Sequence, residues 1–167
     1  MNDAISIAVK IDIKSALERL TESVVKDMAY ASLIAGGLLI QNAAKQKAPW
    51  RTGTLRRSIH IGGATHLAPD FAGGAEYDDI GETGDGWSIK VGTNLVYARI
   101  QEYGGVIHAK DAPYLVFKTK DGSWHSVKSV TIPARPYLRP AFDENREVVL
   151  REVAETFGAL LAQRAAL

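Results

Sequence analysis

The sequence predicts an α+β fold, in which a long N-terminal amphipathic helix and a C-terminal helix pack on an antiparallel-rich sheet. Three observations support this prediction. Every second residue from Ile5 to Ile13 is apolar, which is the period of a half-buried strand. The apolar period then changes to three and four from Leu17 onward, and the same helical period returns between Phe142 and Leu160. Short alternating segments lie between these two helices, and 167 residues suffice for a single domain.

The first helix is expected to run for about 30 residues, until Pro49 ends it. Gly36 and Gly37 fall inside it, where they predict either a kink or the close approach of another backbone. A turn over 52–54 then leads into one short helical turn over 55–58, followed by a brief strand at 59–61.

The segment 62–86 is rich in Gly, Ala and acidic residues and has no apolar period, so we interpret it as an insertion loop. Alternating apolar residues then predict a strand over 87–91. Asn94 is expected to cap a short helix over 95–103, which Gly104 would end.

A strand is expected to begin at Val106, and a hairpin is predicted over 114–132 around the turn Asp121-Gly122. Pro140 suits the first position of the closing helix. The whole chain, 1–167, is therefore predicted to be one domain.

Composition and motifs argue against several classes of function. A formal net charge of +1 creates no global field toward nucleic acid, and the absence of cysteine suits a reducing cytosol. No nucleophile elbow, zinc-protease helix, phosphate loop or dinucleotide fingerprint occurs, so we expect no enzyme and no cofactor. The apolar stretch 29–42 is too short to span a bilayer and no signal peptide precedes it, so no membrane partner is expected. The four histidines share no ligand spacing, which argues against a metal site: His60, His66, His108 and His125.

The candidate functional residues are two groups of opposite charge. Lys45 and Lys47 compensate the dipole at the end of the long helix. The arginines that follow lie in a tight turn, and each guanidinium can bind a carboxylate or phosphate in a bidentate manner. We expect them to contact the acidic loop of a neighbouring subunit. Binding of DNA phosphates by the same turn is the alternative. The arginines are Arg51, Arg56 and Arg57, and the acidic residues are Glu76, Asp78, Asp79, Glu82 and Asp85.

Three stretches resemble the tail-component and virion-morphogenesis family of tailed bacteriophages, a group similar to the morphogenesis proteins of Mu-like and lambda-like phages. The first is 48–59 (APWRTGTLRRSI), after the long helix. The second is 91–94 (VGTN), which runs into 97–98 (YA) and 101–105 (QEYGG). The third is 132–141 (IPARPYLRPA), before the last helix. Their order and spacing strengthen the resemblance, which is poor at 5–13 and in the 62–86 loop.

The resemblance implies a structural subunit of a neck or tail-completion ring at the head–tail interface. The six-fold symmetry of such tails makes a hexamer the expected ring. The implied partners are further copies of the chain and adjoining neck and tail proteins, such as head-closure and tail-terminator rings, with DNA possible in the channel. Synthesis in the host bacterial cytoplasm and a final location in the virion follow from the same resemblance.

Overall fold

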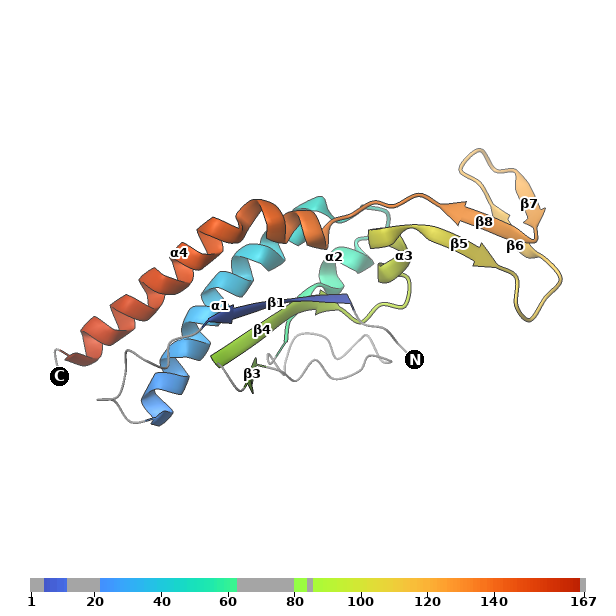
Figure 1. Ribbon diagram of the computed structural model, residues 1–167. Helices are drawn as coiled ribbons and strands as arrows, with labels where there is room; N and C mark the ends of the chain where they lie inside the picture. Colours follow the sequence, from blue (N-terminus) through green and yellow to red (C-terminus); the bar gives the residue numbers. More distant parts are fainter. Residues whose placement is uncertain (1–4, 12–21, 63–79, 84–85, 166–167) are drawn as a thin grey trace.

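The computed structural model describes residues 5–11, 22–62, 80–83 and 86–165, and it has three parts: a pair of long helices, a small sheet, and a projecting β-structure (Figure 1). The long helices are α1 (Glu22–Lys47) and α4 (Leu138–Ala165). They lie side by side and run in opposite directions. The α+β class is confirmed, with a long N-terminal helix, a C-terminal helix and small antiparallel sheets.

A four-stranded sheet covers a second side of α1 and is built around β4 (Gly86–Thr93). β1 (Ile5–Ile11) is antiparallel to β4 on one side, whereas β2 (His60–Ile61) and β3 (Ile80–Thr83) pair with it on the other. The predicted alternation in β4 is confirmed, because the side chains of Trp87, Ile89 and Val91 are all buried.

Glycine lets the two long helices approach closely. A Cβ atom added to Gly36 would lie 2.6 Å from Cγ2 of Val153 on α4, and one added to Gly37 would lie 3.3 Å from Cδ1 of Ile89 on β4. These two adjacent positions therefore bring α1 against both of its neighbours. Of the two consequences considered for these glycines, close approach is the one observed.

α1 is long and apolar enough to cross a membrane by length and composition alone. In the structure it is the central core helix, with buried side chains at Val25, Leu33, Ile40 and Ala44. These positions face α4, the sheet and the short helices.

Two short helices lie at the C-terminal end of α1: α2 (Thr54–Ser58) and α3 (Ala98–Tyr103). α3 begins later than expected, and the cap assigned to Asn94 is wrong. Oγ1 of Thr93 accepts the Leu95 N–H at 3.2 Å, so a turn precedes the helix and Tyr97 occupies the N-cap position.

Beyond α3 the chain leaves the body of the molecule as two antiparallel β-ribbons (Figure 1). β5 (Gly105–His108) pairs with β8 (Ser129–Ile132), and β6 (Leu115–Lys118) pairs with β7 (Trp124–Val127). The single strand expected over 124–132 is thus divided between two pairings. We call residues 105–135 the arm.

The predicted 62–86 loop falls mostly outside the described residues. Its last part contains β3, which the sequence did not predict, since Gly81-Glu82-Thr83 has no alternation and this strand is defined by pairing with β4.

Candidate assembly surface

The arginine turn begins where α1 ends. The Ala48 N–H still donates to the Ala44 carbonyl at 2.8 Å, and Pro49 follows. Gly53 adopts φ 76°, a left-handed conformation that favours glycine, and the Arg57 N–H donates to its carbonyl at 3.0 Å to begin α2. The turn therefore reverses the chain within a few residues.

Arg56 is used inside this turn. Its Nε donates to the Ala48 carbonyl at 3.2 Å and its Nη2 donates to the Gln46 carbonyl at 3.2 Å. The guanidinium also lies 4.9 Å from the ring centroid of Trp50, a cation–π contact. Arg56 thus satisfies carbonyl groups that the end of α1 leaves without helical partners, and its charge opposes the negative end of the helix dipole.

The other two predicted arginines differ from Arg56. Arg51 and Arg57 are both exposed. Arg57 lies beside Gly53, and a Cβ atom added to Gly53 would lie 2.8 Å from Nη1 of Arg57. Of the flanking lysines, Lys47 forms an ion pair of 2.6 Å with Glu144 of α4. Partial burial lowers the pKa of Lys45.

The acidic partners are only partly placed. Glu82 lies on β3, in register with Trp87 of β4. The other four predicted residues lie outside the described residues: Glu76, Asp78, Asp79 and Asp85. Contact between the arginine turn and this acidic group therefore stays a prediction.

Glu102 is an important residue that the sequence reasoning missed. Its carboxylate is buried at the start of α4, where Oε2 accepts the N–H groups of Tyr137 at 2.8 Å and Leu138 at 3.0 Å, and Oε1 accepts that of Arg139 at 2.9 Å. The next residue, Pro140, has no N–H. The free donors in the first turn of α4 are thus satisfied by a residue 35 positions or more away in sequence.

This cap also explains why α4 begins at Leu138 and not at Pro140. The available sequence signal was the absence of an Asp, Ser or Thr before a long helix, which implies a cap from elsewhere. The Arg135 N–H donates to the Gln101 carbonyl at 2.7 Å and reinforces the same junction.

Polar contacts also join the first two of the three sequence stretches. The hydroxyls of Ser58 and Thr93 are buried and 2.7 Å apart, and Gln41 on α1 donates from Nε2 to the Ile59 carbonyl at 2.9 Å. The stretches 48–59, 91–105 and 132–141 therefore form the joints between α1, the sheet, α3 and α4. Their residues hold the fold together at one end of the helix pair.

The arm contributes no side chain to the buried hydrophobic core, although all of residues 105–135 are described. It instead exposes large apolar side chains. Val106 is 50% exposed, Val116 65% and Trp124 71%. Such side chains cluster on surfaces that contact other macromolecules.

A second exposed apolar surface follows α1. Ile34 is 39% exposed and Leu38 is 44% exposed, and Ala31 continues the same side of the helix at a spacing of three and four residues. We call these three residues the α1 stripe. Ala31 also lines the cavity that α1 forms with the last turns of α4.

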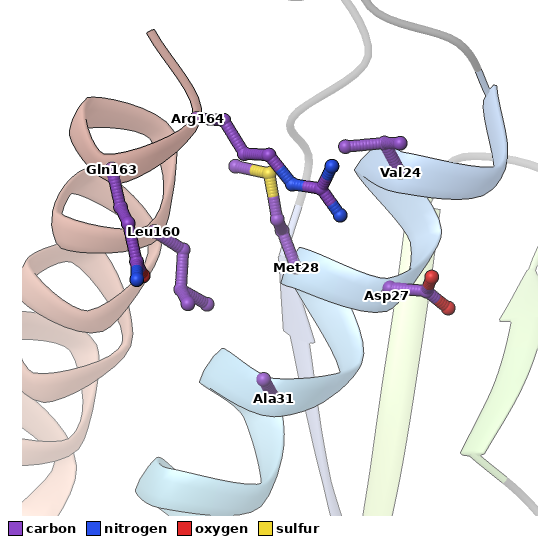
Figure 2. Close-up of a pocket in the computed structure, with 7 residues that line it drawn as sticks. All are labelled: Val24, Asp27, Met28, Ala31, Leu160, Gln163 and Arg164. Atoms are coloured by element: carbon purple, nitrogen blue, oxygen red, sulfur yellow. The ribbon is translucent and has the colours of Figure 1, made fainter. Parts of the chain in front are cut away.

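A cavity of about 500 Å³ lies between the first turns of α1 and the last turns of α4 (Figure 2). It is lined from α1 by Val24, Asp27, Met28 and Ala31 and from α4 by Leu160, Gln163 and Arg164. The side chain of Arg164 extends from α4 toward α1. The cavity contains no nucleophile with an adjacent base. In the part of the chain that the structure describes, no cluster of three His, Asp or Glu side chains could hold a metal ion.

One family model matches the chain, described as "Bacteriophage HK97-gp10, putative tail-component". The match covers residues 11–104, more than half of the 167 residues, and includes the arginine turn and the first part of the α3 junction. It ends immediately before the arm. No curated protein and no solved structure matches.

Proposed function

The chain belongs to the HK97-gp10-like family of phage tail components, and we propose that it is a subunit of a neck or tail-completion ring that joins or completes the tail at the head–tail interface. Membership supports a structural role in the tail and a location in the virion. The observation that carries the ring assignment is the amount of apolar surface that one chain leaves uncovered, on the arm and along α1.

The proposed ring is a homo-hexamer that contacts adjoining proteins such as head-closure and tail-terminator rings. A subunit that presents different surfaces to its two neighbours forms a closed ring when the rotation between copies closes. The role needs no catalysis, since ring subunits act by binding. We propose synthesis in the host cytoplasm, followed by incorporation into the particle.

Electron microscopy of particles made without this chain tests the assembly role. We expect heads and tails that are unjoined or incomplete, with infectivity restored when the chain is supplied in trans. Complete, firmly joined and infectious particles in its absence would falsify the proposal. Averaging of wild-type particles then gives the copy number, for which we expect six.

The arginine turn is proposed to contribute to contacts between subunits, through Arg51 and Arg57 in particular. Because Arg56 binds carbonyl groups of its own chain, Arg57→Glu is the appropriate test. We expect this variant to fold normally and to assemble poorly with its neighbours, whereas Arg146→Glu, a charge reversal on the exposed side of α4, should assemble normally. Equal assembly of the two variants would remove the contact assignment.

Binding of phage DNA by the turn is the second candidate function, favoured by the exposed guanidinium groups of Arg51 and Arg57. Binding to phosphates weakens steeply as the salt concentration rises, with a slope set by the number of contacts. A titration of fluorescent duplex DNA with purified chain tests it. No measurable binding at low salt would dismiss this candidate.

A further inference from the structure

We infer that the buried carboxylate of Glu102 is a latch that fixes the direction in which the arm leaves the body of the molecule. Where the arm begins and ends, residues 101–105 lie against residues 132–139, and we call these two segments the arm joint. The latch is a property of the single chain, so it does not depend on the proposed ring.

The arm is attached to the body through the arm joint. Residues 105–135 contribute no side chain to the buried core, and the strands of the arm have no extensive contact with the described helices or with the four-stranded sheet. Figure 1 shows the arm projecting beyond α3. The β5–β8 ribbon has no third strand, and isolated two-stranded ribbons are at best marginally stable in water. Both the order and the direction of the arm therefore depend on contacts at its base.

Backbone contacts hold the two segments of the joint together. Gly105 is in register with Ile132 in the first pair of the β5–β8 ribbon. One residue earlier, Gly104 has φ 69°, and a Cβ atom added there would lie 2.7 Å from the backbone nitrogen of Ala134. A side chain at position 104 would therefore push the two segments apart, and glycine permits both the conformation and the close approach.

The segment that returns from the arm is stiff and anchored in the body. Pro133 and Pro136 have fixed φ angles, and each also restricts the residue before it. Between them, the Arg135 N–H donates to the Gln101 carbonyl at 2.7 Å. Directly after them, the side chain of Tyr137 is fully buried. This side of the joint is thus fixed to the core where α4 begins.

Glu102 connects the outgoing segment to this anchor. From α3, its carboxylate accepts the N–H groups of Tyr137, Leu138 and Arg139. Hydrogen bonds to an ionised group are strong, and a negative charge at the start of α4 also opposes the helix dipole favourably. A different direction of the arm would leave the buried carboxylate and its donors without partners, so it is disfavoured. A fixed direction also reduces the conformational entropy that is lost when a projecting element binds.

Double electron–electron resonance on the purified full chain tests the latch, because the chain contains no cysteine that would compete for a label. Nitroxide labels at His108→Cys, exposed at the end of β5, and at Leu150→Cys, exposed on α4, report the direction of the arm. A second pair, Ser23→Cys on α1 with Leu150→Cys, reports whether the two long helices stay together. We expect one narrow peak from each pair when the joint is unchanged.

Glu102→Gln should broaden and shift the peak of the arm pair and leave the peak of the helix pair unchanged. Gly104→Ala, which separates the two segments and keeps the carboxylate, should have the same effect. Gln101→Ala is the matched control, because it lies next to Glu102 on α3 and its carbonyl can still accept the Arg135 N–H. It should leave both peaks unchanged.

Three results would overturn the inference. A broad distribution for the arm pair in the unchanged joint would mean that the arm has no fixed direction. Unaltered peaks in both Glu102→Gln and Gly104→Ala would mean that other contacts set the direction. Broadening of the helix pair in both variants would mean that the joint stabilises the whole domain and does not act on the arm alone.

If Glu102→Gln does not fold, Gly104→Ala decides by the same comparison. All these measurements use the isolated chain and its internal distances. The proposed function is tested separately in particles, so the two can fail independently.

Discussion

Removal of the Glu102 carboxylate is expected to destabilise the junction between α3 and α4 severely. In Glu102→Ala the N–H groups of Tyr137 and Leu138 lose their acceptor while both residues are buried. The Arg139 N–H is closer to solvent and can bind water. Each buried donor left without a partner costs about 1–3 kcal/mol, so we expect the free energy of unfolding to fall by about 4 kcal/mol.

Glu102→Gln separates the effect of charge from that of shape. The amide oxygen can accept the two hydrogen bonds that Oε2 now accepts, but the amide nitrogen then faces the Arg139 N–H, and the favourable interaction with the N-terminus of α4 is lost. We expect a loss of about 2 kcal/mol. Glu155→Gln, which removes an exposed carboxylate 3.9 Å from Arg151, is the matched control and should change stability by less than about 0.5 kcal/mol.

Urea denaturation, followed by circular dichroism at one fixed protein concentration, measures these differences. A Glu102→Ala variant within about 0.5 kcal/mol of the wild type would contradict the reasoning, because water or another group would then satisfy the donors. Equal losses for Ala and Gln would show that the charge alone matters.

Three further predictions concern the helix pair, the arginine turn and the arm. Gly36→Ala should destabilise the protein by about 1–3 kcal/mol, because the new Cβ would lie 2.6 Å from Cγ2 of Val153. Gly158→Ala should instead stabilise it by about 0.5–1 kcal/mol, because nothing lies within 4 Å of a Cβ at this helical position. Urea denaturation of both variants checks the difference in sign. Arg56→Ala should cost about 1–2 kcal/mol and Arg57→Ala under about 0.5 kcal/mol in the same assay, and equal losses would contradict the role given to Arg56. Hydrogen bonds from Thr119 and Ser123 lower the pKa of Asp121 below its ordinary value of 3.8. The ionised carboxylate therefore stabilises the turn above its unfolded pKa, and this contribution is lost as the pH falls through the folded pKa. NMR titration of the carboxyl carbon should give a pKa below 3.8, and a pKa at or above this value would be inconsistent with these bonds.

Local apolar patterns in the sequence were sufficient to predict the helices and strands that bury one face against the body of the same chain. The alternation of Trp87, Ile89 and Val91 predicted β4, and the helical period before Pro49 predicted α1, because each pattern reflects burial within the domain. The fold class followed from these elements and is confirmed.

Features that depend on distant residues were beyond such patterns. β3 exists through pairing with β4, and the start of α4 depends on Glu102, which lies on a different helix. The division of 124–132 between β7 and β8 depends on β5, more than 20 residues earlier. In each case the determining contact is tertiary, so the secondary-structure propensity of a short sequence window cannot predict it.

The candidate site was predicted only in part, for a reason visible at Arg56. A basic residue in a tight turn is compatible with two uses: binding a partner, or satisfying the carbonyl groups at a helix end. Sequence cannot separate them, since both favour a guanidinium after a helix. The distances from Arg56 to the carbonyls of Ala48 and Gln46 support the second use.

This assignment changes how the assembly surface should be tested. Charge reversal at Arg56 and Arg57 together would remove the cap of α1, so a failure to assemble could result from a damaged junction as well as from a lost contact. Arg57→Glu avoids that ambiguity, because the hydrogen bonds to the carbonyls of Ala48 and Gln46 come from Arg56 and not from Arg57. The stretches that resemble the family mostly hold the junctions, whereas the arm lies outside the matched residues and contributes nothing to the buried core. Substitutions in the arm can therefore alter binding to a neighbour with little effect on the body, which makes Val116 a cleaner probe of assembly than any residue of the arginine turn.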